Sequence, residues 1–276
     1  MIKKAIFFLL FISGVVYSQT VNGSVQNEDK QNLTGAIVSV EESNIGVVTD
    51  ENGLFSIDLT DIDKSKYIVA YLGGYESYRI KVSDFINLKK PIITLKGKVI
   101  DLKEVGISPK KMSEKNLGVR KKSAIEYCGY DSELDKYLFK EYAIKIKNKK
   151  KIKLKNINIT LTNYNIETPI LLMFDIYNDK NDFPNESLLE ETLSKLISNS
   201  DIKNNEISLD VSDKNIWIEE DFYVSVRTAN DFKGKLILSG NVFAFSQDTY
   251  YRLYNGNWTK YSSGAPSINV DVFIKK

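Results

Sequence analysis

The most informative absence in this sequence is histidine, which occurs at none of its 276 positions. Without an imidazole, the chain cannot build a Ser-His-Asp or Cys-His catalytic arrangement. The usual zinc sites also draw on histidine, and a four-cysteine site needs more than the single cysteine, Cys128. Carboxylate, lysine or tyrosine chemistry remains, so we expect a protein that is not an enzyme.

A lone cysteine also excludes an internal disulfide bond. Cys128 lies in the segment "AIEYCGY", among apolar and aromatic neighbours. Free cysteines are among the most often buried residues, so we interpret Cys128 as a small core residue. The competing interpretations, a reactive thiol or an intermolecular link, stay open.

Long apolar runs are missing except at the start of the chain. Lys3 and Lys4 precede an apolar stretch, and Val16 and Ser18 supply the small residues of a cleavage site. This pattern is typical of a secretory signal peptide over 1–18, and the stretch is too short for a spanning helix. We therefore expect an exported mature chain with no membrane-spanning segment, located in the periplasm, at the outer membrane or outside the cell.

An excess of either charge is absent as well. The formal net charge is +2, and the two lysines of the expected leader account for it. A nearly neutral mature chain gives no reason to expect nucleic acid as a partner.

What the sequence does contain is a series of short β-strand patterns. From 19 to about 95, apolar runs alternate with turn residues at roughly ten-residue spacing, which indicates an antiparallel sandwich. The lysine-rich stretch 108–135 is interpreted as a linker. From 136 to 276 the pattern is again β, so we expect an all-β chain with domains over 19–107 and 136–276. One stretch, 186–197, has leucines at helical spacing and is ambiguous.

The first domain resembles the carboxypeptidase regulatory-like domain of exported proteins from Bacteroidetes-type bacteria. The matching segments are "VNGSV", "LTGAIVSV", "GVVTDENGLF", "YLGGYESY" and "LKEVGIS", in that order. The resemblance implies a seven-stranded, transthyretin-like sandwich without an active site of its own. The family usually has one glycine before the tyrosine, whereas Gly73 and Gly74 are doubled here.

The second half resembles, more loosely, the jelly-roll or galactose-binding-like sandwiches of similar proteins. The segments "FDIYNDKNDFPNESLLEE" and "YYRLYNGNWTKY" carry this resemblance. It implies a second β-sandwich in which 186–197 is extended, and we favour a strand there over a helix.

Two acidic segments invite a metal interpretation. In "TDENG", Asp50 and Gly53 suit a hairpin turn, and the oxygens stop too early for an EF-type calcium loop. In "DIYNDKNDF", Asp175, Asp179 and Asp182 offer oxygens that suit a structural calcium ion. We favour a polar loop there as well, and we expect no other cofactor.

A late cluster of aromatic residues is the best candidate for ligand binding. Flat rings stack on sugars and pack at protein interfaces. The candidates are Tyr251, Tyr254, Trp258 and Tyr261. Alternation must send part of this cluster into the core, and Trp258 is the residue most expected there.

Together these patterns favour an exported, non-enzymatic cell-envelope protein for binding or scaffolding, with an envelope protein or a glycan as partner. The first alternative is a carbohydrate-binding or adhesin accessory protein. The second is a histidine-free glycan hydrolase that uses two carboxylates. The oligomeric state and the ligand are not specified by the sequence.

Overall fold

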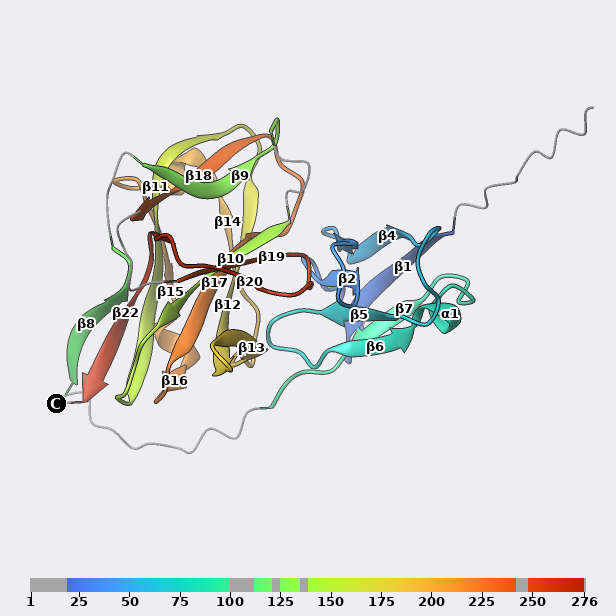
Figure 1. The fold of residues 1–276 in the computed structure, drawn as a ribbon, viewed down its shortest axis with the longest axis horizontal. Coiled ribbons are helices and arrows are strands. Elements are labelled where there is room, and N and C mark those ends of the chain that lie inside the picture. The colour runs from blue at the N-terminus through green and yellow to red at the C-terminus, as the bar shows by residue number, and fades with distance from the viewer. Residues whose placement is uncertain (1–18, 100–111, 121–124, 135–138, 242–247, 276) are drawn as a thin grey trace, which may run out of the picture.

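The computed structural model describes residues 19–99, 112–120, 125–134, 139–241 and 248–275, and within these ranges the chain forms two β-sandwiches (Figure 1). The predicted leader over 1–18 lies outside the described residues. No helix within the described ranges has the length and apolar character needed to cross a membrane. The all-β prediction is confirmed.

The first sandwich packs a three-stranded sheet against a four-stranded sheet (Figure 1). The first sheet has the order β4 (Leu54–Asp58), β1 (Thr20–Asn27), β7 (Ile92–Leu95). The second has the order β3 (Gly46–Val48), β2 (Ile37–Val40), β5 (Tyr67–Tyr71), β6 (Tyr78–Lys81). Side chains alternate between the core and the outside, as in β4, where Phe55 and Ile57 are buried and Leu54 is exposed. One helical turn, α1 (Val82–Phe85), adds Phe85 to this core.

The segment "TDENG" forms a tight turn, but the prediction of a hairpin was wrong. β3 pairs with β2 and β4 pairs with β1, so the turn carries the chain from one sheet to the other. The turn chemistry itself is as expected: Asp50 Oδ1 accepts the backbone N–H groups of Asn52 and Leu54 at 2.9 and 2.8 Å. Gly53 has a φ of +69°, which glycine adopts at little cost.

The second sandwich packs a seven-stranded sheet against an eight-stranded one. The seven-stranded sheet contains β13 (Phe183–Ser187), β12 (Ile170–Lys180), β17 (Phe222–Thr228), β10 (Lys140–Ile146), β19 (Thr249–Leu253) and β20 (Thr259–Tyr261), with β14 (Leu193–Ile197) also paired to β12. The eight-stranded sheet contains β21 (Ala265–Pro266), β18 (Gly234–Asn241), β11 (Ile152–Ile166), β22 (Ile268–Lys275), β8 (Met112–Gly118), β15 (Glu206–Asp210), β16 (Trp217–Ile218) and β9 (Glu126–Asp131). Ile144, Ile157 and Val224 are fully buried in the core that these sheets enclose.

Two expectations about the chain path have a clear outcome. The stretch 108–135 is not only a linker, because β8 pairs with β22 and β9 pairs with β18 in the second sandwich. β8 contains one lysine, but Lys110, Lys111, Lys121 and Lys122 flank it in the sequence, so the whole stretch has the composition of an exposed connector. The stretch 186–197 is extended, as favoured: β14 pairs with β12, with Leu193 opposite Phe174 and Ile197 opposite Ile170. Leu193 and Ile197 are buried, whereas Leu196 is exposed.

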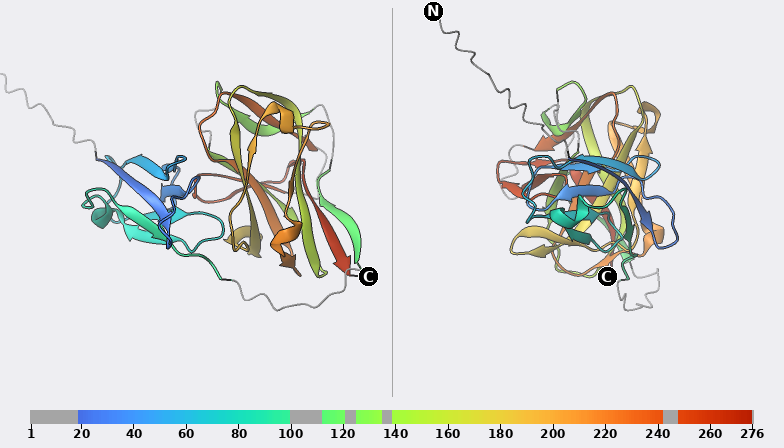
Figure 2. Two further views of the ribbon diagram at one scale, coloured as in Figure 1. Left: turned by 180° about the vertical axis from the view of Figure 1, so that it is seen from behind. Right: turned by 90° about the vertical axis from the view of Figure 1, so that its right-hand side faces the viewer.

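The two sandwiches meet face to face (Figures 1 and 2). The outer face of the β2–β5 pair contributes Ile37 and Tyr71 to an apolar cluster that Tyr177 and Tyr223 of the seven-stranded sheet share. That sheet is therefore covered on both sides, which explains why every residue of β17 is buried.

Candidate functional site at the domain junction

A buried ion pair lies at the centre of the junction between the sandwiches. Glu141 of β10 and Arg252 of β19 are direct cross-strand neighbours, and Arg252 Nε lies 2.7 Å from Glu141 Oε2. The other oxygen of Glu141 accepts hydrogen bonds from the hydroxyls of Tyr177 and Ser225 at 2.8 and 2.6 Å. The Trp258 ring covers the guanidinium, with Arg252 Cζ 4.3 Å from its centroid.

Nearby arginine charges keep the Glu141 carboxyl ionised although it is buried. Burial acts to raise the pKa of the Glu141 carboxyl, but the charges of Arg252 and Arg227 together with its hydrogen bonds hold that pKa below its ordinary value. Glu141 is 1% exposed and Arg252 is 7% exposed, so the pair is shielded from solvent. Such a pair holds a fixed geometry only while both partners are present.

The first sandwich joins this network through Tyr71. Its hydroxyl donates to Asp175 of β12, and Ser187 Oγ donates to the other oxygen of Asp175 at 2.5 Å. Two further hydrogen bonds cross the junction: Arg227 Nη2 donates to Gly35 O, and Thr192 Oγ1 donates to Gly73 O, both at 2.8 Å. All four carboxylate oxygens of Glu141 and Asp175 thus accept hydrogen bonds, which is typical of a structural network.

Asp175 gives the junction a defined pH dependence. Burial raises the pKa of this carboxyl above its ordinary value of 3.8. The folded state therefore binds a proton more tightly than the unfolded state, so the contribution of Asp175 to stability is complete below 3.8 and is lost as pH rises through the raised pKa. We predict that the free energy of unfolding of the wild type rises relative to that of Asp175→Asn as the pH is lowered through this window. Urea unfolding at several pH values measures this difference.

Asp58 provides a control of opposite sign. The hydroxyl and backbone N–H of Thr60 lower the pKa of its carboxyl, so the contribution of Asp58 falls as the pH falls. As the pH is lowered, the free energy of unfolding of the wild type should therefore fall relative to that of Asp58→Asn. An Asp175→Asn variant with the same pH trend as Asp58→Asn would contradict the assignment.

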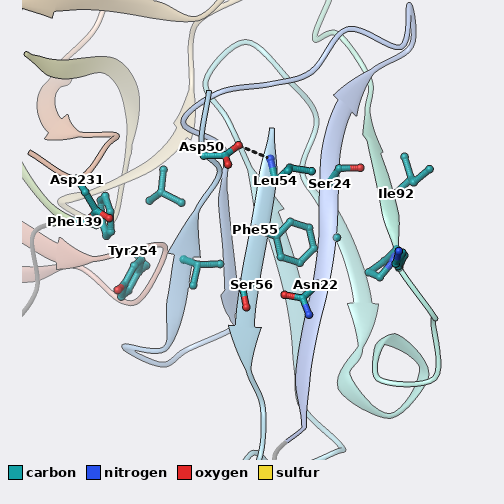
Figure 3. A pocket seen from close by; sticks show the side chains of 15 residues that line it. Asn22, Ser24, Asp50, Leu54, Phe55, Ser56, Ile92, Phe139, Asp231 and Tyr254 are labelled. Carbon is teal, nitrogen blue, oxygen red and sulfur yellow. Dashed lines mark hydrogen bonds between the residues drawn. The ribbon is translucent and has the colours of Figure 1, made fainter. Parts of the chain in front are cut away.

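Beside the network, an open cleft of about 720 Å³ runs between the two sandwiches (Figure 3). Its lining includes Val47 and Val48 of β3 and Leu54, Phe55 and Ser56 of β4. The second sandwich supplies Phe139, Asp231 and Tyr254, which face the first sandwich across the cleft.

Close packing fixes the aromatic wall of this cleft. The rings of Phe139 and Tyr254 lie 5.9 Å apart, and the backbone N–H of Tyr254 donates to Phe139 O at 3.2 Å. A Cβ at Gly46 would lie 2.8 Å from Cγ of Tyr254, so the absent side chain of Gly46 lets Tyr254 contact β3 directly. The wall is thus held by both domains.

The described lining of the cleft contains more acidic than basic residues. Asp50 and Asp231 contribute two carboxylates, whereas Lys90 is the one basic residue in the described lining. Asp50 is engaged by its own turn through Oδ1. Asp231 is exposed and has no ion-pair partner among the residues that the structure describes.

The structure separates the four aromatic residues predicted to bind ligand. Tyr254 lines the cleft, and Trp258 packs on Arg252 inside the junction. Tyr251 and Tyr261 form a ring pair 5.4 Å apart on β19 and β20, and Tyr261 is 47% exposed. They do not form one binding surface, and a ligand-binding role for them stays a prediction.

The three carboxylates of the calcium interpretation do not come together in one site. Asp179 and Asp182 both pair with Lys145, and Asp182 also pairs with Lys260. Asp175 lies apart from them in the junction, bonded to Tyr71. The described part of the chain contains no group of three metal-ligating side chains, and a structural calcium ion stays a prediction. Cys128 is half-buried and packs against the second core, and burial raises the pKa of its thiol.

The sequence reading missed Glu141, Arg252 and Tyr71. One signal was present in the alternation of the strands: on β10 and β17, the side chains opposite the core include Glu141, Ala143 and Arg227, which are buried. The doubled glycine was another signal. A Cβ at Gly74 would lie 2.6 Å from the Cα of Glu191 in the second sandwich, so this extra glycine permits close approach of the domains.

Comparisons with solved structures give low similarity over most of the chain. Among solved structures, the chain is similar to a variant of BcpA, the major pilin subunit of Bacillus cereus, at 13% identity and a TM-score of 0.18, covering 90% of this chain and 68% of that one. A chain from the infectious bursal disease virus Gt strain shows 10% identity and a TM-score of 0.24, covering 92% of this chain and 59% of that one. Neither similarity is close enough to support an argument about function. No curated protein matches the chain.

The family comparison is more informative, and it agrees with the ordered series of glycines and apolar residues found in the sequence. The matched residues begin in β1, include all strands of the first sandwich, and extend past β7. Residues 21–107 of this chain match the family model of the CarboxypepD_reg-like domain.

Proposed function

We propose that the chain is an exported, non-enzymatic cell-envelope protein that binds a partner in the cleft at the junction of its two β-sandwiches. The single observation that carries this proposal is the open cleft with walls from both domains. Ligand sites occur preferentially at domain interfaces, are mostly apolar and contain a few polar groups, as this cleft does.

The exposed apolar side chains support a binding role. Leu54 is 51% exposed and Ile92 is 65% exposed, and both line the cleft beside Val47 and Phe139. An apolar patch of this kind on a folded surface is typical of an interaction site. The leader pattern at 1–18 supports export.

A non-enzymatic role is supported by the way the junction uses its acids. The oxygens of Glu141 and Asp175 accept hydrogen bonds from Arg252, Tyr71 and other donors, and no histidine is present to serve as a base. The hydrogen bond from Tyr71 to Asp175 links the domains, and the cleft beside it carries the exposed surface. The scaffold and the binding site are therefore two parts of one junction.

The proposal predicts that a neutral apolar probe binds in the cleft. N-phenyl-1-naphthylamine should bind the wild type with a rise in fluorescence, and Leu54→Ser should weaken that binding about five- to tenfold, since it removes a contact worth about 1 kcal/mol. Leu196→Ser is the matched control, because Leu196 is 60% exposed on β14 and does not line the cleft.

Equal effects of Leu54→Ser and Leu196→Ser on probe binding would contradict a site in the cleft. Binding to a glycan array that Tyr261→Ala abolishes and Leu54→Ser leaves intact would instead favour the carbohydrate-binding alternative, carried by the Tyr251–Tyr261 pair.

A further inference from the structure

The free edge of β4 lines the cleft. Val25 N–H donates to Gly53 O, and Leu59 N–H donates to Gln19 O, so odd-numbered positions of this segment bond to β1 and its extension. In an antiparallel pair the bonded positions alternate, so the N–H and C=O of Ser56 point away from β1. In the sheet that the structure describes, β4 is the outermost strand on that side.

The neighbouring edge of β3 has the same property. Val40 N–H donates to Ile45 O, and Thr49 N–H donates to Ala36 O, which places the bonded positions of this segment at odd numbers. The backbone groups of Val48 therefore point away from β2. Val48 and Ser56 both line the cleft, so the outer edges of two sheets border it, and no strand of the described ranges pairs with either edge.

These edges contain no basic residue and no proline. Edge strands commonly carry lysine, proline or a bulge that prevents another strand from pairing with them. β3 and β4 contain none of lysine, arginine or proline, whereas the edge strands β8 and β20 each contain a lysine. A free edge beside an apolar cleft is the arrangement that binds an extended peptide by strand addition.

The charges of the cleft specify the peptide further. Asp231 is exposed and lies on the wall formed by the second sandwich, next to Phe139 (Figure 3). A basic side chain of the partner would neutralise it, while an apolar side chain fills the space beside Tyr254. With two carboxylates and one lysine in the lining, the cleft favours a cationic over an anionic segment.

We propose that the partner is an extended polypeptide segment that adds as a strand to the free edge of β4, with an apolar side chain in the cleft and a basic side chain facing Asp231. This inference rests on the proposed binding function and names the class of partner. Affinity comes from the backbone hydrogen bonds at Ser56, and selectivity comes from the apolar wall and the carboxylate.

The test uses a fluorescein-labelled synthetic peptide, Thr-Val-Thr-Leu-Lys-Val-Thr-Val, with blocked ends, and measures anisotropy with the full chain. We expect saturable binding that weakens about tenfold when lysine is replaced by glutamate in the peptide. Methylating alternate backbone nitrogens on one edge of the peptide should weaken binding about tenfold or more, and methylating the other edge should not, because a strand bonds to β4 through one edge.

Variants of the protein provide the reciprocal test. Asp231→Lys should reverse the preference, so that the glutamate peptide binds better than the lysine peptide. Asp61→Lys is the control, since Asp61 is exposed and does not line the cleft. Ser56→Pro should abolish peptide binding and leave the fold intact, because the N–H of Ser56 is not used in the sheet.

Peptide binding that is indifferent to methylation of either edge, or that survives Ser56→Pro in a folded protein, would overturn strand addition. Binding of the naphthylamine probe, sensitive to Leu54→Ser, without any peptide binding would overturn this inference and leave the proposed function standing. Absence of both would overturn both.

Discussion

Replacing Glu141 with alanine is expected to lower the free energy of unfolding by about 3–5 kcal/mol, because the charge of Arg252 would then be buried without a partner. The hydroxyls of Tyr177 and Ser225 would lose their acceptor at the same time. Urea unfolding of the full chain, followed by circular dichroism, measures the effect.

Glu41→Ala is the matched control for this prediction. Glu41 also pairs with an arginine, Arg79, at 2.7 Å, but that pair is exposed. Exposed pairs contribute about 0–1 kcal/mol, so Glu41→Ala should have little effect. Equal losses from the two variants would contradict the central role given to the buried pair. Replacing Glu141 and Arg252 together by leucine and methionine should restore most of the loss, since no unpaired charge remains.

A single methyl group at Gly74 is expected to destabilise the junction by about 2–4 kcal/mol. Gly74 has a φ of +89°, which is unfavourable for any residue with a side chain. A Cβ there would also lie within 2.6–2.8 Å of three backbone atoms of Glu191, so one domain would have to move. Thermal unfolding and small-angle scattering of Gly74→Ala measure the stability and the separation of the sandwiches.

Gly97→Ala is the control for the change from glycine to alanine. A Cβ at Gly97 meets no atom within 4 Å, and its φ lies outside the strained range. A Gly74→Ala variant as stable and as compact as Gly97→Ala would show that the domains do not contact each other at this point.

The strands of both sandwiches were predictable because alternation is a local signal. Phe55 and Ile57 of β4 are buried where the period of two places them, and the glycines of the first domain identify its family. At 186–197 the leucines satisfy a helical period by accident, and only pairing with β12 decides in favour of a strand. The lysines on either side of β8 likewise favoured a linker, and only its pairing with β22 decides in favour of a strand.

The junction could not be predicted from local patterns. Glu141 and Arg252 are 111 residues apart, and Tyr71 and Asp175 are 104 residues apart, so their contacts depend on strand order and domain docking. The positions of the late aromatic residues also depend on long-range strand pairing. Tyr254 lines the cleft, whereas Trp258 packs against the buried junction cluster. The pairing of the strands around them decides this difference.

Native-state hydrogen exchange in the wild type and Glu141→Ala tests most directly whether the two sandwiches form one unit. Glu141 lies in the second sandwich, and β5, which carries Tyr71, lies in the first. If the junction couples them, the amides of β5 and β17 will lose protection by the same factor in the variant. Faster exchange in β17 with unchanged exchange in β5 would contradict a single rigid junction.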